Sequence, residues 1–294
     1  PICRMEAMLE NQYVNFITGD AMMEPSIRIE TNKKGFCHRH FSQMFEKGQK
    51  LPNALILESH LQEIIDDSNN IVFFGGAGVS TESGIPDFRS TDGLYHQQYA
   101  YPPETILSHS FFMAHTGEFY EFYKEKMLFS DVEPNAAHKK LAELEAAGKL
   151  TAVITQNIDG LHQAAGSKNV LELHGSVHRN YCRRCRKFYD AKYMKNAIDI
   201  PLCDCGGIIK PDVVLYEESL NGDTIEAAVT ALHNADLLII GGTSLAVYPA
   251  AGLIQYFGGS RIVLLNRDVT PYDGRATLCI REPIGKVLGQ IQVR

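Results

Sequence analysis

The sequence has no apolar run long enough to cross a membrane, no secretory signal at its start, no internal repeat and no low-complexity segment. It also lacks an excess of basic residues, because its net charge is −7. These absences argue against a membrane protein, an exported protein and a protein that wraps nucleic acid. We therefore expect a cytoplasmic protein. Since the chain opens at Pro1 rather than Met, we also expect its natural start to lie further upstream.

The composition is that of a globular protein. Its 294 residues suffice for one large domain or two ordinary ones, and 45% of them are apolar, enough for a sizeable core. Residues 178–212 differ locally, with eight basic side chains against four aspartates. We favour a solvated face for this segment over a patch for an acidic partner, so nucleic acid is not an expected partner.

Four short, nearly continuous apolar segments predict buried strands, at residues 71–74, 151–154, 237–240 and 261–265. One helix is expected from about Leu57 to Asp67, after a turn at Leu51-Pro52. Strands that are apolar on both faces are typical of a parallel sheet between layers of helices. The predicted fold class is therefore α/β, with a Rossmann-like parallel sheet, helices on both faces and a partly helical insertion over residues 92–134.

Small or polar residues follow each predicted strand. The four motifs are Gly75-Gly76-Ala77-Gly78, Thr155-Gln156-Asn157-Ile158-Asp159, Gly241-Gly242-Thr243-Ser244 and Asn266-Arg267-Asp268. The carboxyl ends of parallel strands meet at one edge of a sheet, which is where ligands bind. The sequence therefore predicts one site built from all four motifs.

The first glycine motif predicts a nucleotide site. Glycines directly after a buried strand let the backbone turn tightly, and the N–H groups freed there can hold phosphate. A lone Gly-x-Gly is often only a tight turn, and the acidic residue of the common dinucleotide fingerprint is missing. However, the motif continues into Gly84-Ile85-Pro86-Asp87-Phe88-Arg89. This continuation adds two charges and an aromatic wall, which core packing does not require.

Two further motifs supply polar side chains. Asn157 and Asp159 could cap the next helix, but capping does not explain the whole run from Gln156 to His162. We expect the two side chains to bind a carboxamide or a ribose. His174 precedes a glycine, and an ordinary histidine pKa suits a base at neutral pH. A lone histidine is more often a satisfied polar residue, so both interpretations stay open at this point.

Four of the seven cysteines are clustered, which in a chain without an export signal indicates a metal in a reducing compartment rather than disulfides. Seventeen residues separate the two pairs, a spacing typical of a zinc ribbon. We prefer this interpretation to four unrelated thiols. Four thiolates fill a tetrahedral zinc site, so we expect a structural ion. The predicted ligands are Cys182, Cys185, Cys203 and Cys205.

Residues 1–56 lack the pattern of strands and glycines, and we expect them to be an N-terminal extension to a domain of residues 57–294. Cys37 and His40 have the spacing of a metal knuckle, to which Cys3 could contribute. Ordinary thiols in a polar loop are an equal alternative. The segment resembles the start of an uncharacterised bacterial family with Cys-Pro-x-Cys and Gly-Phe-Cys-x-x-His motifs.

From about residue 57 to its end, the chain resembles the sirtuins, a family of NAD-dependent protein-lysine deacetylases. The resemblance covers 237 positions in the family's order and implies a small zinc-ribbon module at about 178–212. It rests on these segments: Gly76–Ser80, Gly84–Arg89, Thr155–His162, His174-Gly175, the four cysteines, and Gly242–Ser244 with Asn266.

The resemblance implies that NAD is a co-substrate bound along the sheet edge. His174, Asn157 and Asp159 would be catalytic, and Val213 with Val214 would pair with an acylated peptide. The implied NAD-binding residues are Gly76, Ala77, Gly78, Ser80, Thr81, Ile85, Asp87, Phe88, Arg89, Gln156, Asn157, Ile158, Asp159, Gly242, Thr243, Ser244, Asn266, Asp268 and Cys279.

The implied reaction removes acyl groups from protein lysines and gives nicotinamide and O-acyl-ADP-ribose, with His174 as the base on a ribose hydroxyl. The implied partners are acetylated proteins. One alternative is ADP-ribosyl transfer to protein at the same site, and another is a non-catalytic module that binds NAD and zinc. His174 favours deacylation, because that pathway needs a base on the ribose.

Two departures from the family bear on the substrate. Tyr216-Glu217-Glu218 stands where the family often has Phe-Gly-Glu, at the substrate entrance. Sirtuins that prefer succinyl or malonyl groups carry a Tyr-x-x-Arg pair, but here Tyr99 is followed by Pro102 at that spacing. Because an acidic acyl group would lack its charge partner, we expect acetyl or another neutral acyl group.

Overall fold

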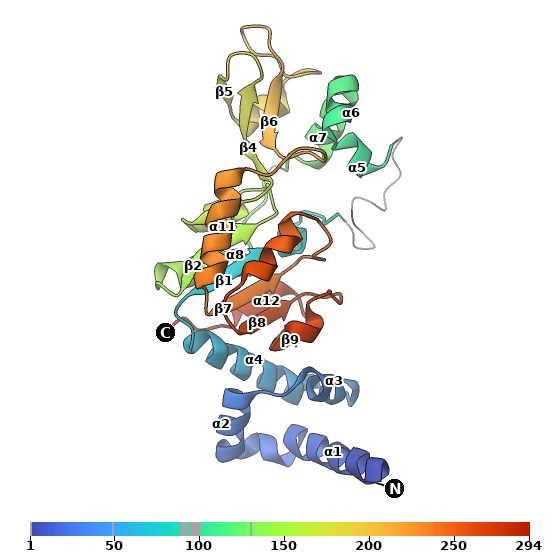
Figure 1. The fold of residues 1–294 in the computed structure, drawn as a ribbon, viewed down its shortest axis with the longest axis vertical. Coiled ribbons are helices and arrows are strands. Elements are labelled where there is room, and N and C mark those ends of the chain that lie inside the picture. Colours follow the sequence, from blue (N-terminus) through green and yellow to red (C-terminus); the bar gives the residue numbers. More distant parts are fainter. Residues whose placement is uncertain (1, 49, 89–92, 94–100, 130) are drawn as a thin grey trace.

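Six parallel strands form the central sheet of the computed structural model, which describes residues 2–48, 50–88, 93, 101–129 and 131–294 (Figure 1). The strand order is β3-β2-β1-β7-β8-β9, the doubly wound Rossmann arrangement, and it confirms the predicted fold class. The order reverses between β1 and β7, at the centre of the sheet. The strands are β1 Ile71–Gly75, β2 Leu150–Thr155, β3 Val170–Glu172, β7 Leu237–Gly241, β8 Arg261–Leu265 and β9 Leu278–Ile280.

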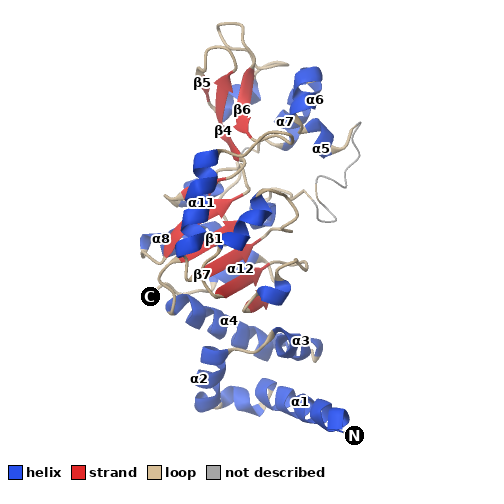
Figure 2. Cartoon of the chain, in the orientation of Figure 1, coloured by secondary structure: helices blue, strands red, loops and turns tan. Residues whose placement is uncertain are grey.

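Helices cover both faces of this sheet (Figure 2). Successive strand residues point to opposite faces, so Phe73 and Ile239 join one buried cluster while Phe74 and Ile240 join the other. This explains why the middle of each central strand is apolar on both faces. Beside the sheet lie α4 Lys50–Asp66, α8 Ala136–Ala146, α9 Leu161–Ala165, α11 Gly222–Asn234, α12 Ile284–Gly289 and the 3-10 helix η5 Ala250–Tyr256.

A second, smaller lobe lies at one end of the sheet (Figure 1). Its three antiparallel strands have the order β5-β4-β6 and carry the four clustered cysteines on and beside them. The described part of the insertion is helical and shares a buried cluster with this lobe. The elements are β4 Gly175–Cys182, β5 Phe188–Tyr189, β6 Ile209–Val213, α5 Pro103–Ile106, α6 His109–Ala114, α7 Thr116–Lys126 and α10 Ala191–Asn196.

Four helices form the N-terminal end of the chain, which lies at the opposite end of the molecule from the small lobe (Figure 1). The turn predicted at Leu51-Pro52 is wrong, because α4 begins at Lys50 and runs through this pair. Proline is tolerated in the first turn of a helix, where its missing N–H has no partner to lose. No described helix is long and apolar enough to cross a membrane. The other three helices are α1 Ile2–Thr18, α2 Pro25–Lys34 and α3 His38–Glu46.

Candidate active site

A cleft of about 390 Å³ opens at the carboxyl ends of β1, β2, β7 and β8, between the sheet and the small lobe. All four polar motifs that follow the predicted strands contribute to its lining. The predicted site residues that line it are Ala77, Gly78, Ser80, Thr81, Ile85, Asp87, Phe88, Gln156, Asn157, Ile158, Asp159, His174, Val213, Val214, Gly242, Thr243, Ser244, Asn266 and Asp268.

The glycine loop after β1 packs directly against the loop after β7. A Cβ atom on Gly76 would lie 2.8 Å from the Cβ of Thr243, and one on Gly78 would lie 2.8 Å from the Cα of Gly242. The Gly78 N–H donates to the Gly242 carbonyl oxygen at 2.8 Å. Side chains at the two glycines would separate the loops, so glycine is what lets two backbones meet at the switch point of the sheet.

A buried polar network lies between this loop and the loop after β2. The Asn157 amide donates to the Ser80 hydroxyl at 3.0 Å, and that hydroxyl donates to an Asp159 carboxylate oxygen at 2.6 Å. The other Asp159 carboxylate oxygen accepts the Leu161 N–H at 2.9 Å. The side-chain Nε2 of Gln156 is buried and has no protein partner. The network fixes these groups, and Gln156 keeps a donor available to a ligand.

His174 is held in one tautomer by the backbone. Its Nδ1 lies 2.9 Å from the Gln156 carbonyl oxygen, which can only accept, so Nδ1 carries the proton and Nε2 is free to take one. Burial lowers the pKa of His174 below its ordinary 6.5, and the hydrogen bond to Gln156 opposes that shift. The imidazole is therefore neutral at pH 7 and competent as a base.

β6 is an edge strand of the small lobe, and no described strand pairs with its side away from β4, where the Ile209 N–H donates to the Pro201 carbonyl oxygen. Its last residue, Val213, pairs with Gly175, and the Val214 N–H donates to the His174 carbonyl oxygen at 3.0 Å. A Cβ on Gly175 would lie 1.9 Å from the Asp212 carbonyl oxygen. The glycine after His174 thus permits the close pairing that brings the histidine beside Val213 and Val214.

Two of the predicted NAD-binding residues lie outside the cleft lining, and a third is not among the described residues. Gly76 supports the loop from behind, against Thr243. Cys279 lies in β9 and does not line the cleft. It is half-buried against the cluster that contains Phe74 and Ile240. Arg89 falls outside the described residues. The roles predicted for Cys279 and Arg89 stay predictions.

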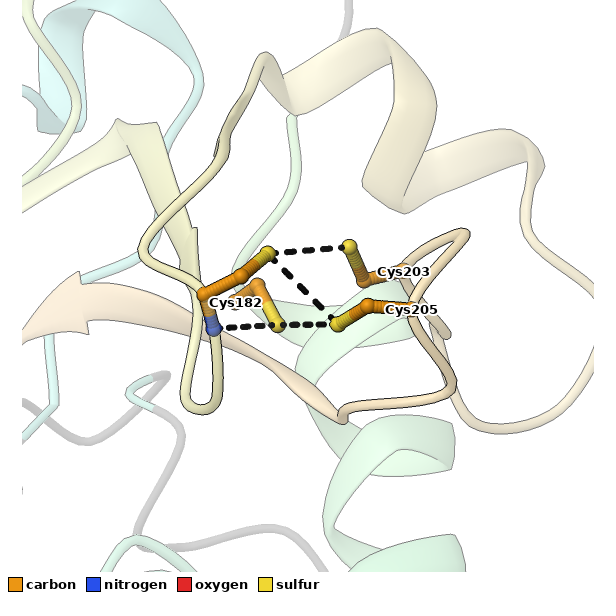
Figure 3. Close-up of side chains that lie close together, drawn as sticks. Cys182, Cys203 and Cys205 are labelled. Carbon is orange, nitrogen blue, oxygen red and sulfur yellow. Dashed lines mark hydrogen bonds between the residues drawn. The ribbon is translucent and has the colours of Figure 1, made fainter.

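The four clustered cysteines converge in the small lobe (Figure 3). The sulfur atoms of Cys182 and Cys205, and those of Cys185 and Cys203, are 3.5 Å apart, and all four lie within 4.8 Å of one another. Zn–S bonds of about 2.3 Å place tetrahedral sulfurs roughly 3.8 Å apart, so the cluster fits one zinc ion. A Cβ on Gly207 would lie 2.7 Å from the Cys182 sulfur, which explains the glycine after the second cysteine pair.

Comparison with known proteins agrees with the resemblance that the sequence motifs showed. Residues 76–249 match the model of the Sir2 family. The chain belongs to the Sir2 family. It is 60% identical to an NAD-dependent protein deacetylase of Clostridium acetobutylicum over 234 residues, which are 78% of this chain and 96% of that protein. It is 52% identical to a protein of the same name from Cutibacterium acnes, over 78% of this chain and 94% of that protein.

Solved structures of Sir2 proteins share the fold. A Sir2 structure with a p53 peptide and NAD⁺ has a TM-score of 0.68 and 42% identity, covering 78% of this chain and 94% of that chain. A Sir2 homolog in complex with NAD has a TM-score of 0.70 and 37% identity, covering 78% and 90%. Residues 1–78 separately match the model of a family of unknown function (DUF6062).

Sequence motifs did not identify every part of this Sir2-family cleft. The insertion contributes Leu107, Tyr123, Met127 and Phe129 to the lining, which no motif indicated. The loop after β6 contributes residues 215–218, of which Tyr216-Glu217-Glu218 were expected at the substrate entrance. Apolar side chains on short helices have no chemical signature in a sequence. The positive φ of Glu217 (75°) cannot be derived from its own residue type. The family often has glycine at this position, and that difference was a usable signal.

The second metal site considered near the N-terminus gains no support. The Cys37 sulfur lies 3.2 Å from Nδ1 of His40, but no third ligand joins this pair in the part of the chain that the structure describes. The side chain of Cys3 is outside that part. The metal knuckle at Cys37 and His40 therefore stays a prediction.

Proposed function

We propose that this protein removes acetyl, or another neutral acyl, groups from lysine side chains of proteins, consuming NAD and giving nicotinamide and O-acyl-ADP-ribose. One observation carries the proposal: His174, with a free Nε2, faces the same cleft as the glycine loop at the switch point of the sheet. The relatives named NAD-dependent protein deacetylase support it.

The residues present fit NAD. The loop from Ala77 to Thr81 would hold the pyrophosphate, first through the Ala77 N–H, because the N–H groups of Gly78, Val79 and Ser80 already donate to backbone carbonyls. Thr243 with Ser244 would hold the neighbouring phosphate and ribose. Asn266 and Asp268 would hold the adenosine ribose. Ile85, Asn157, Ile158 and Asp159 would surround the nicotinamide. When bound, NAD supplies the ribose that takes up the acyl group as nicotinamide leaves.

His174 would act as the general base. Its Nδ1–H stays on the Gln156 carbonyl while Nε2 takes a proton from a ribose hydroxyl. Asn157 and Asp159 would hold the reacting groups in position. Ser80 hydrogen-bonds to both side chains and so fixes them in one network that lines the cleft. The two lobes on either side would exclude water that otherwise hydrolyses NAD.

An acylated peptide would add a strand at the open edge of β6, next to Val213 and Val214. Main-chain hydrogen bonds of this kind bind a peptide without reading its sequence, so we expect several acetylated proteins as substrates. A cytoplasmic location is part of the proposal, because the four zinc ligands must stay reduced.

The acyl group would meet an apolar wall. Leu107, Met127 and Phe129 of the insertion line the cleft, and the ammonium group of Lys126 is paired with Glu125 at 2.8 Å. We therefore expect acetyl-lysine peptides to react faster than matched succinyl-lysine peptides, and a faster succinyl reaction would overturn this preference.

Mass spectrometry tests the proposed function. An acetylated peptide is incubated with the protein, with and without NAD. The proposal requires loss of the acetyl group only with NAD, together with formation of O-acetyl-ADP-ribose. An unchanged peptide, or addition of ADP-ribose to the peptide, would reject it.

A further inference from the structure

Apolar side chains are unusually exposed in the N-terminal helices. Of the twenty large apolar side chains that are exposed among the described residues, nine lie between Met5 and Leu51, in about a sixth of the chain. The Sir2 family model begins only at residue 76, so the family's reaction gives no reason for them. Five of the nine belong to α1.

These five side chains form one stripe on α1. At 100° per residue, positions 5, 8, 9, 13 and 16 fall within an arc of about 140°. Val14 and Thr18 are buried on the opposite side of the helix, where α1 packs against its neighbours. The exposed fractions are 62% for Met5, 58% for Met8, 48% for Leu9, 66% for Tyr13 and 48% for Phe16.

The stripe faces away from the rest of the molecule. α1 lies at the end of the molecule farthest from the small lobe, and no other element lies beyond it (Figure 1). Arg4, Glu6 and Asn15 lie on the two sides of the stripe and are exposed. An apolar centre with a polar rim is the composition of a protein–protein interface.

The stripe is complementary to itself in the antiparallel direction. A two-fold axis at the level of Glu10 and Asn11 would pair Met5 with the partner's Phe16 near the midline of the stripe, and Leu9 with the partner's Tyr13 on one side of it. Met8, on the other side, would meet the partner's Gln12. The first contact sets a methionine sulfur against an aromatic ring, which is a favourable contact. The symmetry generates each contact twice.

The area is sufficient for a pair. Side chains of this size present on the order of 200 Å² each, so the stripe exposes roughly 500 Å² per chain. Pairing two stripes would bury about 1,000 Å², the lower limit of a specific interface, before the polar rim is counted.

We propose that α1 is a self-association surface, on which a second copy of this chain binds through its own α1 in an antiparallel two-fold pair. The active-site cleft lies between the sheet and the small lobe, away from α1, so the pair leaves both clefts open. The proposal does not depend on the proposed reaction.

Sedimentation velocity of the full chain tests the association. Between about 1 and 100 µM, we expect the mass to rise from one chain to two. Leu9→Glu should raise the dissociation constant at least tenfold, because it buries a charge close to the two-fold axis of the interface. Ile198→Glu, at a fully exposed apolar position of the small lobe, is the matched control and should change nothing. Circular dichroism verifies that both variants are folded.

Oxidative cross-linking tests the direction. In a Cys3→Ser, Cys37→Ser background, chains with Met5→Cys and chains with Phe16→Cys are oxidised, each alone and as a mixture. We expect a disulfide-linked dimer only in the mixture. A wild-type monomer at 100 µM, a dimer that Leu9→Glu does not weaken, or cross-linking of the Met5→Cys chain to itself would each overturn the proposal.

Discussion

At the scale of single residues, His174 determines how the reaction responds to pH. Its pKa is lowered by burial, so the imidazole stays neutral somewhat below pH 6.5 and becomes protonated only in more acidic solution. Because the proposed base must be neutral, kcat for deacetylation should be flat above pH 7 and fall through a midpoint below 6.5. His174→Ala should lower kcat by about 10²-fold or more. A pH profile with its midpoint above 7 would contradict this role.

Glu217 is the residue at which this chain departs most clearly from the family's pattern. It has a φ of 75°, which is unfavourable for a side chain other than glycine. Its carboxylate accepts hydrogen bonds from the N–H and hydroxyl of Ser110 at 2.8 and 2.9 Å. These bonds tie the loop that lines the cleft to the start of α6.

Substitutions at Glu217 should therefore affect peptide binding. Glu217→Ala keeps the unfavourable φ and loses both hydrogen bonds, so KM for the peptide should rise about tenfold while KM for NAD stays unchanged. Glu217→Gln keeps an acceptor and should restore most of the affinity. Steady-state kinetics with each substrate varied in turn decides the matter. An equal rise in both KM values would show a general loss of structure instead.

At the residue scale, chemistry is easier to predict than position. The polar and glycine motifs could be predicted from the sequence because few folds need those residue types directly after buried strands. The φ of Glu217 and the place of Tyr123 in the cleft lining could not be predicted. The first is a backbone dihedral angle and the second depends on which way a helix face points, and tertiary packing determines both. The same limit applies to Cys279, whose predicted contact with the nucleotide remains untested.

At the scale of elements, the zinc module depends on its ion. The four thiols lie in a lobe whose described sheet has three strands and whose buried cluster is shared with the insertion, so the lobe has little core of its own. Cys205→Ser should lower the zinc content from one ion per chain to near zero and reduce deacetylase activity at least tenfold. Cys37→Ser, an exposed cysteine of the N-terminal helices, should keep its zinc and activity. Metal analysis by mass spectrometry checks both.

The contact between α8 and α9 makes stability depend on pH. The rings of His138 and His162 lie 4.7 Å apart and both are buried. Burial lowers the pKa of His138 to about 4 and that of His162 to about 3, below the value of 6.5 in an unfolded chain. Both histidines are therefore neutral in the folded protein, whereas the unfolded chain takes up protons below pH 6.5.

The contribution of the two neutral histidines to stability is complete above pH 6.5. It is lost as the pH falls toward their pKa values in the folded protein, about 4 for His138 and about 3 for His162. Between pH 7 and 5 it should decrease by about 2 kcal/mol for each histidine. Urea unfolding at both pH values, in the wild type and in His162→Leu, isolates the effect, since the carboxylates and the other histidines titrate in both proteins. The variant should lose less stability than the wild type. An equal loss would rule out His162 as the source.

The sheet was partly predictable. The four longer strands of the sheet are mostly apolar and were predicted within one residue at each end. β3 and β9 were not predicted, because edge strands of three residues are too short to show a hydrophobic pattern. The early start of α4 was missed because Pro52 indicates a break unless it falls in the first turn, and only neighbouring helices decide that.

At the scale of the whole molecule, three parts lie in a line: the N-terminal helices, the sheet and the small lobe (Figure 1). The cleft is formed by the last two. The strand order could be anticipated as a doubly wound sheet, whereas the packing of α1, α2 and α3 could not, because residues 1–56 carry no motif with a known arrangement. The N-terminal helices share a buried cluster with the sheet through α4.

The central claim is that cleavage of NAD and removal of the acyl group are one coupled reaction in the cleft around His174. The direct measurement is the ratio of nicotinamide released to acetyl groups removed in a single turnover, with and without an acetylated peptide. The account predicts one nicotinamide for each acetyl group and no release without the peptide. Nicotinamide release at the same rate without the peptide would contradict it.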